Sequence, residues 1–404
     1  METIARMKNT VQDYPWGSRT FIAELLGQSV PSERPMAELW LGAHPKAPSR
    51  VAVDGRWVSL LELIEERPGE VLGEAVAARF GRQLPYLFKV LAAAQPLSIQ
   101  AHPDLQQARE GFARENRLGI ALDDPRRNYR DANHKPELIC ALTDFWALKG
   151  FRPVPEILEN LSPLDDPRLL PQLADLRAAP DAEGLKRFFG ELMTLAENRR
   201  ERVVAAAVAH ARRRPADDAV GTWVRRLAGA YPGDIGVLAP LFMNLVCLAP
   251  GEAMFLEAGQ LHAYLSGSGI ELMANSDNVL RGGLTPKHID VPELLRVLRF
   301  TTGPARILHP EPDGPCEAAY RQPAPEFALS VITLQKDRPL ARPGRGVEIL
   351  LCLRGTAEVR DDRGGRLVLS RGQSLLVPAA VGGLTLSGEA VLYSAHLPQP
   401  GENA

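Results

Sequence analysis

Residues 248–265 read LAPGEAMFLEAGQLHAYL, and this stretch predicts the fold because a second stretch aligns with it. The second stretch, residues 369–386, reads LSRGQSLLVPAAVGGLTL. Each has a glycine near its start, Gly251 in the first copy and Gly372 in the second. At 6, 8 and 11 residues after this glycine, the first copy has Glu257, Gly259 and His262. At the same spacings the second copy has Pro378, Ala380 and Gly383. Each copy reads as a turn, an apolar strand, a tight turn and another strand. Two related antiparallel β-domains are therefore expected.

The glycine and the Pro/Glu-x-Gly turn in this pattern resemble the second motif of cupin jelly rolls. In that motif the turn directs a histidine into the barrel, and His262 occupies this place in the first copy. The second copy has Gly383 at the same place, which has no side chain. The pattern therefore predicts a metal-binding first barrel and a C-terminal barrel without metal, which has a structural or partner-facing role.

The length and composition are those of a globular protein of several domains. At roughly 150 residues per domain, the 404 residues correspond to two or three domains. Hydrophobic residues make up 45% and charged residues 24%, which excludes a largely disordered chain. The 47 Lys and Arg residues nearly balance the 49 Asp and Glu residues, and the net charge of −2 argues against nucleic acid or an anionic membrane as a partner.

The cysteines and the apolar segments indicate the compartment. Four cysteines lie far apart without a CxxC pair, and three of them lie in apolar runs such as ELICAL (137–142) and NLVCLAP (244–250). These three are predicted to be small core residues in a reducing cytoplasm. The start of the chain, METIARMKNTVQDY, lacks the apolar run of a signal peptide. The most apolar stretch, 236–250, is too short to span a bilayer, so a cytoplasmic location is expected.

Residues 153–232 differ in character from the rest of the chain. Apolar residues recur there at i, i+3 and i+4 among Ala, Leu, Glu and Arg, which predicts four or five helices separated by Pro and Asp. The Arg-rich segment 197–214 suggests RNA binding at first sight, but its charges alternate with VVAAAVA. A solvated face of a packed helix is therefore the preferred interpretation.

Polar residues occur at three points where apolar strands are predicted. In SIQAH, Ser98, Gln100 and His102 are two residues apart and share one face of a strand. Glu137 begins the apolar strand ELICAL, and His262 lies between apolar runs in GQLHAYL. If the amide, the carboxylate and the two imidazoles converge inside a barrel, they form an O/N/O/N ligand set that suits zinc, with other first-row ions also open. A net positive charge would remain, which makes such a site a Lewis acid toward a carbonyl or enediolate oxygen.

Each of these residues also has a simpler interpretation. A lone histidine near a strand is more often a hydrogen-bonded core or surface residue, and Glu137 alone would fit a surface ion pair. The co-occurrence of the QxH pair, the polar segment NHKPE (133–137) and the turn before His262 favours the metal site. Structural roles are assigned to the histidines without such neighbours, which are His44, His210, His309 and His396.

Five long motifs, in chain order, resemble type I phosphomannose isomerases. They are VQDYPWGS (11–18), AELWLGAHPKAPS (37–49), LPYLFKVLAAAQPLSIQAHPD (84–104), NYRDANHKPELICALTDFWALKGFR (128–152) and GQLHAYLSGSGIELMANSDNVLRGGLTPKH (259–288). The resemblance covers residues 10–300 and implies interconversion of mannose 6-phosphate and fructose 6-phosphate. It also implies one zinc ion per chain, held by the matching residues Gln100, His102, Glu137 and His262.

The resemblance further implies the architecture, which is mainly β with an α-helical insertion. In this family a helical domain interrupts a cupin-like catalytic domain, and a second cupin-like barrel follows. The matching parts here are 1–152 and 234–300 for the discontinuous catalytic domain, 153–233 for the helical insertion and 301–404 for the C-terminal barrel lacking metal ligands. The family's default oligomeric state, a monomer, is expected.

An aldose–ketose isomerase acts through an enediol and needs a base, a stabiliser for oxyanion charge and a clamp for the phosphate. Arg281 precedes two glycines, where substrate can approach the backbone closely, and its match in the family is a catalytic arginine. Lys135, beside a metal ligand, and Glu271, between two apolar residues, are both open as the base. His134 is expected to assist ring opening of the sugar, and Asp277 is expected in the active site.

The substrate-binding candidates are a serine, several cations and one tryptophan. Ser98, Lys89, Lys287 and Arg281 are candidates for the phosphate, because no glycine-rich phosphate loop opens a helix. Trp16 is either an ordinary core aromatic or a wall of the sugar pocket, since sugars present apolar C–H faces to aromatic rings. The expected partner is thus a small phosphosugar.

Three other functions fit parts of the pattern. A non-catalytic cupin that binds metal and sugar as a sensor or regulator would not need Arg281 and Lys135. A cupin oxygenase would favour iron with a facial His/carboxylate arrangement, without the amide of Gln100. A bifunctional sugar-nucleotide enzyme would carry an N-terminal glycine-rich signature, which the sequence lacks. The isomerase is therefore preferred, and both mannose breakdown and mannose supply for glycan synthesis through GDP-mannose are open as its pathway.

Overall fold

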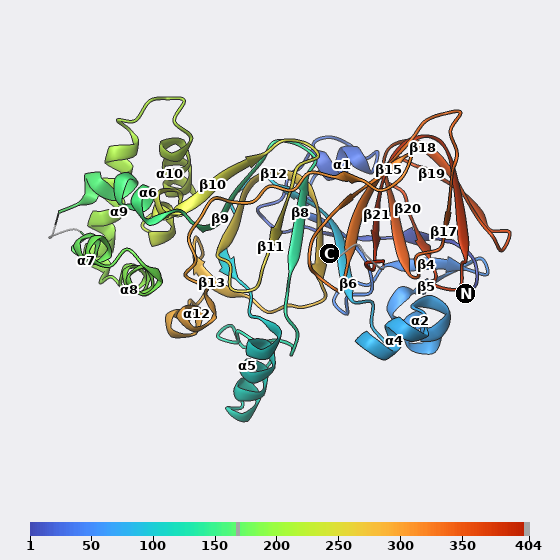
Figure 1. Cartoon of the computed structure of the whole chain (residues 1–404), viewed down its shortest axis with the longest axis horizontal. Coiled ribbons are helices and arrows are strands. Elements are labelled where there is room, and N and C mark those ends of the chain that lie inside the picture. Colours follow the sequence, from blue (N-terminus) through green and yellow to red (C-terminus); the bar gives the residue numbers. More distant parts are fainter. Residues whose placement is uncertain (167–169, 400–404) are drawn as a thin grey trace.

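The computed structural model describes residues 1–166 and 170–399. Figure 1 shows two β-rich bodies side by side, with a helical body attached at the outer end of the first. The predicted fold class, mainly β with a helical insertion, is confirmed. No helix among the described residues has both the length and the apolarity to cross a bilayer.

The first barrel is built around β12 (His262–Ala274), which pairs with strands on both sides. The other strands of its sheet are β2 (Thr10–Gln12), β3 (Glu38–Leu41), β6 (Tyr86–Ala93), β7 (Ile99–Ala101), β8 (Glu137–Ala141), β9 (Phe145–Phe151), β10 (Met243–Leu248), β11 (Ala253–Leu256) and β13 (Leu280–Gly283). The first half of β12 pairs with β7 and β9, and the second half pairs with β6 and β8. The partners change at a register shift between Tyr264 and Ser266, beside Gly267 at φ +125°. Strand β12 therefore joins the two layers of this barrel.

The second barrel belongs to an 11-stranded antiparallel sheet. Its C-terminal strands are β14 (Glu311–Pro312), β15 (Glu317–Tyr320), β16 (Ala328–Leu334), β17 (Leu340–Pro343), β18 (Glu348–Asp361), β19 (Arg366–Ser370), β20 (Ser374–Val377) and β21 (Gly383–His396). The sheet continues from β20 into β1 (Ala5–Lys8), β4 (Arg50–Val53) and β5 (Arg56–Ser59). The N-terminal segment therefore supplies strands to both barrels, an exchange that the predicted domains do not contain. The domain boundaries themselves stay a prediction.

The internal repeat is a structural repeat. Strand β11 begins two residues after Gly251, and β20 begins two residues after Gly372. Strands β12 and β21 both begin eleven residues after the same glycines. The two glycines have φ of +90° and +79°, a left-handed conformation that favours glycine. The predicted order of turn, strand, turn and strand is thus confirmed in both copies.

The helical body lies between β9 and β10, which pair with Phe151 opposite Met243. It contains α6 (Val154–Leu161), η1 (Ser162–Leu164), α7 (Gln172–Ala178), α8 (Ala182–Met193), α9 (Glu197–Ala211), α10 (Ala219–Ala230), η2 (Ile235–Leu238) and α11 (Ala239–Phe242). The Arg-rich segment forms α9, whose buried residues are Val203, Val204, Ala207 and Ala211. The segment is therefore a packed helix, as the alternation of its charges with valine and alanine indicates.

The remaining helices cover the barrels. They are α1 (Phe21–Leu25), α2 (Leu60–Glu66), α3 (Pro68–Val71), α4 (Glu74–Phe80), α5 (Leu105–Arg117) and α12 (Val291–Val297). Helix α5 starts three residues after His102 with a capping box, in which the carboxylate of the N-cap residue Asp104 accepts from the Gln107 N–H at 2.8 Å. The cap fixes the point at which the chain leaves β7, and so the end of the segment that carries Gln100 and His102.

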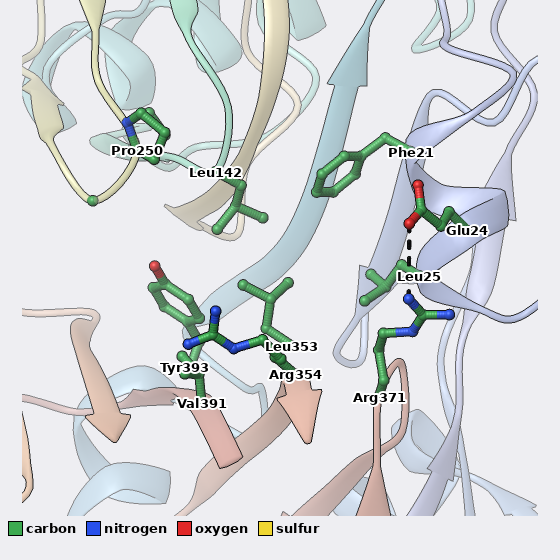
Figure 2. Close-up of a pocket in the computed structure, with 12 residues that line it drawn as sticks. Phe21, Glu24, Leu25, Leu142, Pro250, Leu353, Arg354, Arg371, Val391 and Tyr393 are labelled. Carbon is green, nitrogen blue, oxygen red and sulfur yellow. Dashed lines mark ion pairs between the residues drawn. The ribbon is translucent and has the colours of Figure 1, made fainter. Parts of the chain in front are cut away.

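The two barrels pack on each other through one apolar core. Its fully buried residues include Phe88, Leu272, Ile349 and Ala395, two from each barrel. A groove of about 370 Å³ lies beside this core. Figure 2 shows Leu142 and Leu353 pointing into it from the two barrels. None of its described lining residues is a candidate site residue, so the groove is separate from the site described below.

The prediction that the cysteines of apolar runs are core residues is wrong for Cys247. Cys140 and Cys352 are buried, whereas Cys247 is exposed. Strand β10 is the edge strand of its sheet, and alternate residues of an edge strand can face solvent. The apolar run NLVCLAP does not reveal this position.

Candidate metal centre

Three buried side chains meet inside the first barrel. His102 follows β7, Glu137 begins β8, and His262 begins β12. Their ligand atoms lie within 4.8 Å of one another, and the three residues are 1%, 3% and 1% exposed. The two Glu137 oxygens divide between the imidazoles, with Oε1 at 3.2 Å from His102 Nε2 and Oε2 at 3.4 Å from His262 Nε2. The structure therefore brings three of the four predicted metal ligands together.

The backbone orients both imidazoles toward the centre of this cluster. His102 Nδ1 donates to the Asn278 carbonyl at 2.7 Å, and His262 Nδ1 donates to the Gln260 carbonyl at 2.9 Å. A neutral imidazole that donates from Nδ1 carries its lone pair on Nε2. Both Nε2 atoms are buried and lack a hydrogen-bond partner among the described residues. Two buried lone pairs that face a carboxylate are costly without a cation, so this donor set fits a metal ion such as zinc.

The charges in the cluster favour the metal-binding forms of its residues. Lys135 Nζ lies 3.0 Å from Glu137 Oε1. Burial acts to raise the pKa of Glu137, but Lys135 and His102 outweigh it and hold that pKa well below the ordinary range. Burial lowers the pKa of His102 to about 4. At neutral pH the cluster therefore offers an ionised carboxylate and a neutral His102 imidazole.

Strand register places Gln100 and Arg281 beside the cluster. Gln100 lies opposite His262 on one side and opposite Arg281 on the other. Gln100 and Arg281 are both half-buried. The fourth predicted ligand and the predicted catalytic arginine are therefore cross-strand neighbours.

A second buried charged group extends from β3 to β12. Lys89 Nζ lies 2.8 Å from Glu271 Oε2 and 3.7 Å from Glu38 Oε1, and Trp40 Nε1 donates to Glu38 Oε2 at 2.6 Å. Burial raises the pKa of Glu271, against the Lys89 ammonium. Burial acts to lower the pKa of Lys89, but Glu271 and Glu38 outweigh it and raise that pKa above the ordinary value. The structure thus places Lys89, a phosphate candidate, between two carboxylates.

Three cations gather at the end of β13. Burial lowers the pKa of Arg281, and the nearby Arg130 guanidinium lowers it further. Burial, Arg281 and Arg130 together lower the pKa of Lys287. In the part of the chain that the structure describes, none of the three cations forms an ion pair with a carboxylate within 4.0 Å. Such a group has unbalanced positive charge, which suits an anion.

Asp277 and His134 have partners of their own. Asp277 Oδ2 lies 2.8 Å from Lys46 Nζ and 3.6 Å from His44 Nε2. Burial acts to raise the pKa of Asp277, but His44 and Lys46 outweigh it and hold that pKa below its ordinary value. His134 Nε2 lies 2.7 Å from Oε1 of Glu326, which precedes β16 of the second barrel. The structure therefore places the His134 side chain against the second barrel, not in the cluster of metal ligands.

Ser98 and Trp16 are both partly buried. Ser98 is half-buried and directly precedes β7. Trp16 packs against the apolar cluster of Leu91, Ile139 and Tyr264, and its ring stacks on Tyr14 with 5.8 Å between the centroids. This packing is that of a partly buried core aromatic, and it is equally compatible with Trp16 forming a wall of the sugar pocket.

Three residues of the site were not predicted from the sequence. Glu38 pairs with Lys89, and Arg130 adds to the cation group. Asn278 is fully buried. Its side-chain oxygen accepts from the main-chain N–H of Arg130 at 2.7 Å, and its main-chain oxygen accepts from His102 and so orients that imidazole. The signals were a carboxylate within the apolar run AELWLG and polar residues inside the motifs NYRDANHKPE and NSDN.

Two family models match this chain. The model described as phosphomannose isomerase type I, catalytic domain, matches residues 4–154, and the model for the helical insertion domain of the same family matches residues 169–243. The chain is 44% identical over 388 residues to the mannose-6-phosphate isomerase of Escherichia coli (strain K12), which covers 95% of this chain and 97% of that protein. The chain belongs to the type I phosphomannose isomerases.

More distant phosphomannose isomerases and solved structures agree with this family. The mannose-6-phosphate isomerase of Bos taurus is 35% identical over 425 residues and covers 92% of this chain and 94% of that protein. A crystal structure of a mutant phosphomannose isomerase from Salmonella typhimurium has a TM-score of 0.93 at 41% identity, covering 98% of this chain and 100% of that chain. A zinc-bound mannose 6-phosphate isomerase has a TM-score of 0.91 at 42% identity, with the same coverage. The predicted family is therefore confirmed.

Proposed function

We propose that this chain interconverts mannose 6-phosphate and fructose 6-phosphate through a cis-enediol, at a site that holds one zinc ion. The observation that carries the proposal is the buried cluster of His102, Glu137 and His262, in which both imidazole Nε2 atoms lack a hydrogen-bond partner among the described residues. The curated relatives are mannose-6-phosphate isomerases over nearly their whole length, and a zinc-bound structure has the same fold.

The zinc ligands in this proposal are Gln100, His102, Glu137 and His262. When bound, zinc supplies Lewis-acid stabilisation of the negative charge that develops on sugar oxygens. The backbone carbonyls of Asn278 and Gln260 hold the two imidazoles in the tautomer that binds a metal.

Lys135 or Glu271 is the proposed base that moves a proton between C1 and C2. Lys135 lies at the cluster, 3.0 Å from Glu137, and can hand a proton to a neighbouring carbon of the sugar. Glu271 is buried, and its raised pKa brings the carboxylate closer to the neutral range in which a base is effective. Arg281, the cross-strand neighbour of Gln100, is proposed to bind the developing oxyanion.

The proposed phosphate clamp consists of Lys287 and Arg130, with Arg281 beside them as the alternative phosphate ligand if it does not bind the oxyanion, and Ser98 stays a candidate. These cations lie together and have no carboxylate ion-pair partner among the described residues. A phosphate dianion would supply the missing countercharge. Lys89, which forms an ion pair with Glu271, stays a candidate for binding the phosphate.

The proposal is tested with the full-length protein, mannose 6-phosphate and D2O. We expect fructose 6-phosphate, with deuterium incorporated from solvent wherever the transferred proton exchanges. Chelation is expected to abolish turnover, and added zinc is expected to restore it. A zinc-loaded, folded sample that binds the phosphosugar without forming product would overturn the isomerase and would support a sugar-binding sensor instead.

A further inference from the structure

The two barrels can be matched residue by residue through their strand registers. In the first barrel, Glu137 of β8 lies opposite Leu256, five residues after Gly251. In the second barrel, Glu348 of β18 lies opposite Val377, five residues after the equivalent Gly372. Glu348 is therefore the counterpart of the metal-site carboxylate Glu137.

The same registers match the rest of the buried charged group. Strands β21, β16 and β15 of the second barrel correspond to β12, β6 and β3 of the first. By register, the counterpart of Glu271 is Ser394, the counterpart of Lys89 is Ser330, and the counterpart of Glu38 is Glu317. The second barrel thus keeps two carboxylates, Glu317 and Glu348, but has a serine in place of Lys89. The exposed fractions of Glu317 and Glu348 are 5% and 0%, so their charges need partners inside the barrel.

At the positions of the other predicted metal ligands, the second barrel has residues that cannot bind a metal through their side chains. His262 lies opposite Gln100, and its counterpart Gly383 lies opposite Pro343. Two residues further along the chain, His102 has the counterpart Arg345. The pairing of β17 extends beyond its last residue, because the Gly344 N–H donates to the Gly382 carbonyl at 2.8 Å. Glycine, proline and arginine therefore stand where the first barrel has ligands.

Two arginines pair with the carboxylates that remain, and Glu348 Oε2 is the one carboxylate oxygen of this pair of residues that lacks a hydrogen-bond partner among the described residues. Arg342 Nη2 contacts Glu348 Oε1 at 2.5 Å, and Arg345 contacts both oxygens of Glu317, at 2.6 and 3.1 Å. The Arg342 and Arg345 side chains are 6% and 12% exposed, so both ion pairs are removed from solvent. Ser394, the counterpart of Glu271, donates to the same Glu348 oxygen.

We propose that the C-terminal barrel is a second copy of the metal-binding barrel in which arginines supply the buried positive charge, Arg342 in place of the metal ion and Arg345 in place of Lys89. The Arg342 guanidinium brings to Glu348 the positive charge that zinc brings to Glu137. The Arg345 guanidinium brings to Glu317 the positive charge that Lys89 brings to Glu38. The cation is part of the chain, so this barrel keeps its buried carboxylates without a metal. The barrel then serves as a permanent partner for the face of the first barrel that packs on β18 and β21.

A double-mutant cycle on the full-length, zinc-loaded protein tests the charge balance. Arg342→Met and Glu348→Gln are each expected to lower Tm by about 5 °C or more, because each leaves one buried charge without its partner at 2.5 Å, and the other carboxylate near Arg342, Glu317, lies 4.0 Å away. The double variant is expected to lose less than the sum of the two single losses, since it removes both charges. Arg342→Lys, which keeps the charge, is expected to retain more of the Tm than Arg342→Met.

The matched control is an exposed pair in the same barrel. Arg366 contacts Glu358 at 2.5 Å, but the Arg366 side chain is 64% exposed. Arg366→Met and Glu358→Gln are expected to change Tm by about 1 °C or less, and additively. Additive losses at Arg342 and Glu348 would overturn the proposal, whatever reaction the first barrel catalyses.

Restoring the ligands gives a second, independent measurement. Four substitutions give the second barrel the residues found at the counterpart positions of the first, namely Arg342→Ile, Pro343→Gln, Arg345→His and Gly383→His. We expect elemental analysis to find two zinc ions per chain in this variant, and one after the further change Glu348→Gln. Retained isomerase activity shows that the variant is folded. A folded, active variant with a single zinc would contradict the proposal.

Discussion

Arg130 belongs to the group of three cations at the end of β13, and its role can be isolated by substitution. We expect Arg130→Ala to raise KM for mannose 6-phosphate by about tenfold with little change in kcat, because a phosphate contact stabilises the ground state and the transition state equally. Arg126→Ala is the matched control, since Arg126 lies near Arg130 in sequence and is paired with Asp124 at 2.8 Å. Steady-state kinetics measure both variants. An unchanged KM for Arg130→Ala would remove this residue from the clamp.

Lys149 of β9 is a buried cation whose titration affects stability. It is 5% exposed, and burial lowers its pKa to about 8. The unfolded chain keeps a pKa of about 10.4, so below pH 8 the lysine is charged in both states and its burial cost is fully present. Between pH 8 and about 10.4 the unfolded state binds more protons, and this cost disappears. We therefore expect Lys149→Met to stabilise the protein by about 1–3 kcal/mol at pH 7 and progressively less above pH 8.

Urea denaturation at about pH 7, 9 and 10 measures this difference between the Lys149→Met variant and the unchanged chain. Lys186→Met is the control, because Lys186 lies on α8 and is exposed. A stabilisation by Lys149→Met that stays constant over this pH range would show that lost packing or polarity, not the charge, is responsible.

The sequence allowed some residues of the site to be predicted and not others. His102, Glu137 and His262 were predicted as a group because alternation within strands places polar side chains on an inner face. The partners of His134 and Lys89 were not predictable, because Glu326 and Glu38 lie far away in the sequence and approach only through strand pairing between distant segments. The cation Arg130 was missed because one arginine among many carries no signal of its own.

At the scale of elements, β12 depends on a glycine at the point where its partners change. Gly267 has φ +125°, and a Cβ there would lie 2.5 Å from the Asp144 carbonyl oxygen. We expect Gly267→Ala to destabilise the protein by about 2–4 kcal/mol, through backbone strain and this clash. Gly229→Ala in α10 is the control, because nothing lies within 4 Å of its added Cβ, and it is expected to stabilise by about 0.5–1 kcal/mol. Denaturant unfolding measures both, and equal effects of the two substitutions would contradict this account of β12.

At the scale of the whole molecule, periodicity predicted elements better than it predicted their assembly. The repeated β-domain and the helices of 153–232 follow from turn spacing, strand alternation and helical periodicity, whereas the insertion of those helices within the catalytic domain follows from the family resemblance. The pairing of β1 with β20 joins residues more than 360 positions apart, and no local pattern encodes such a contact. The counterpart positions of the two barrels likewise became visible through strand register, since the sequences have diverged at three of the four ligand positions.

Metal removal distinguishes the two barrels within one chain. In the first barrel, chelation would leave Glu137 and the two imidazole Nε2 atoms buried without their cation, which weakens the strands that carry them. In the second barrel the arginines stay in place. We therefore expect hydrogen–deuterium exchange to rise in β7, β8 and the start of β12 after chelation, and to stay unchanged in β17, β18 and β21. Added zinc should reverse the rise in the first barrel. An equal rise in β18 and β21 would show that the second barrel depends on the metal of the first and would contradict its stabilisation by a cation of its own.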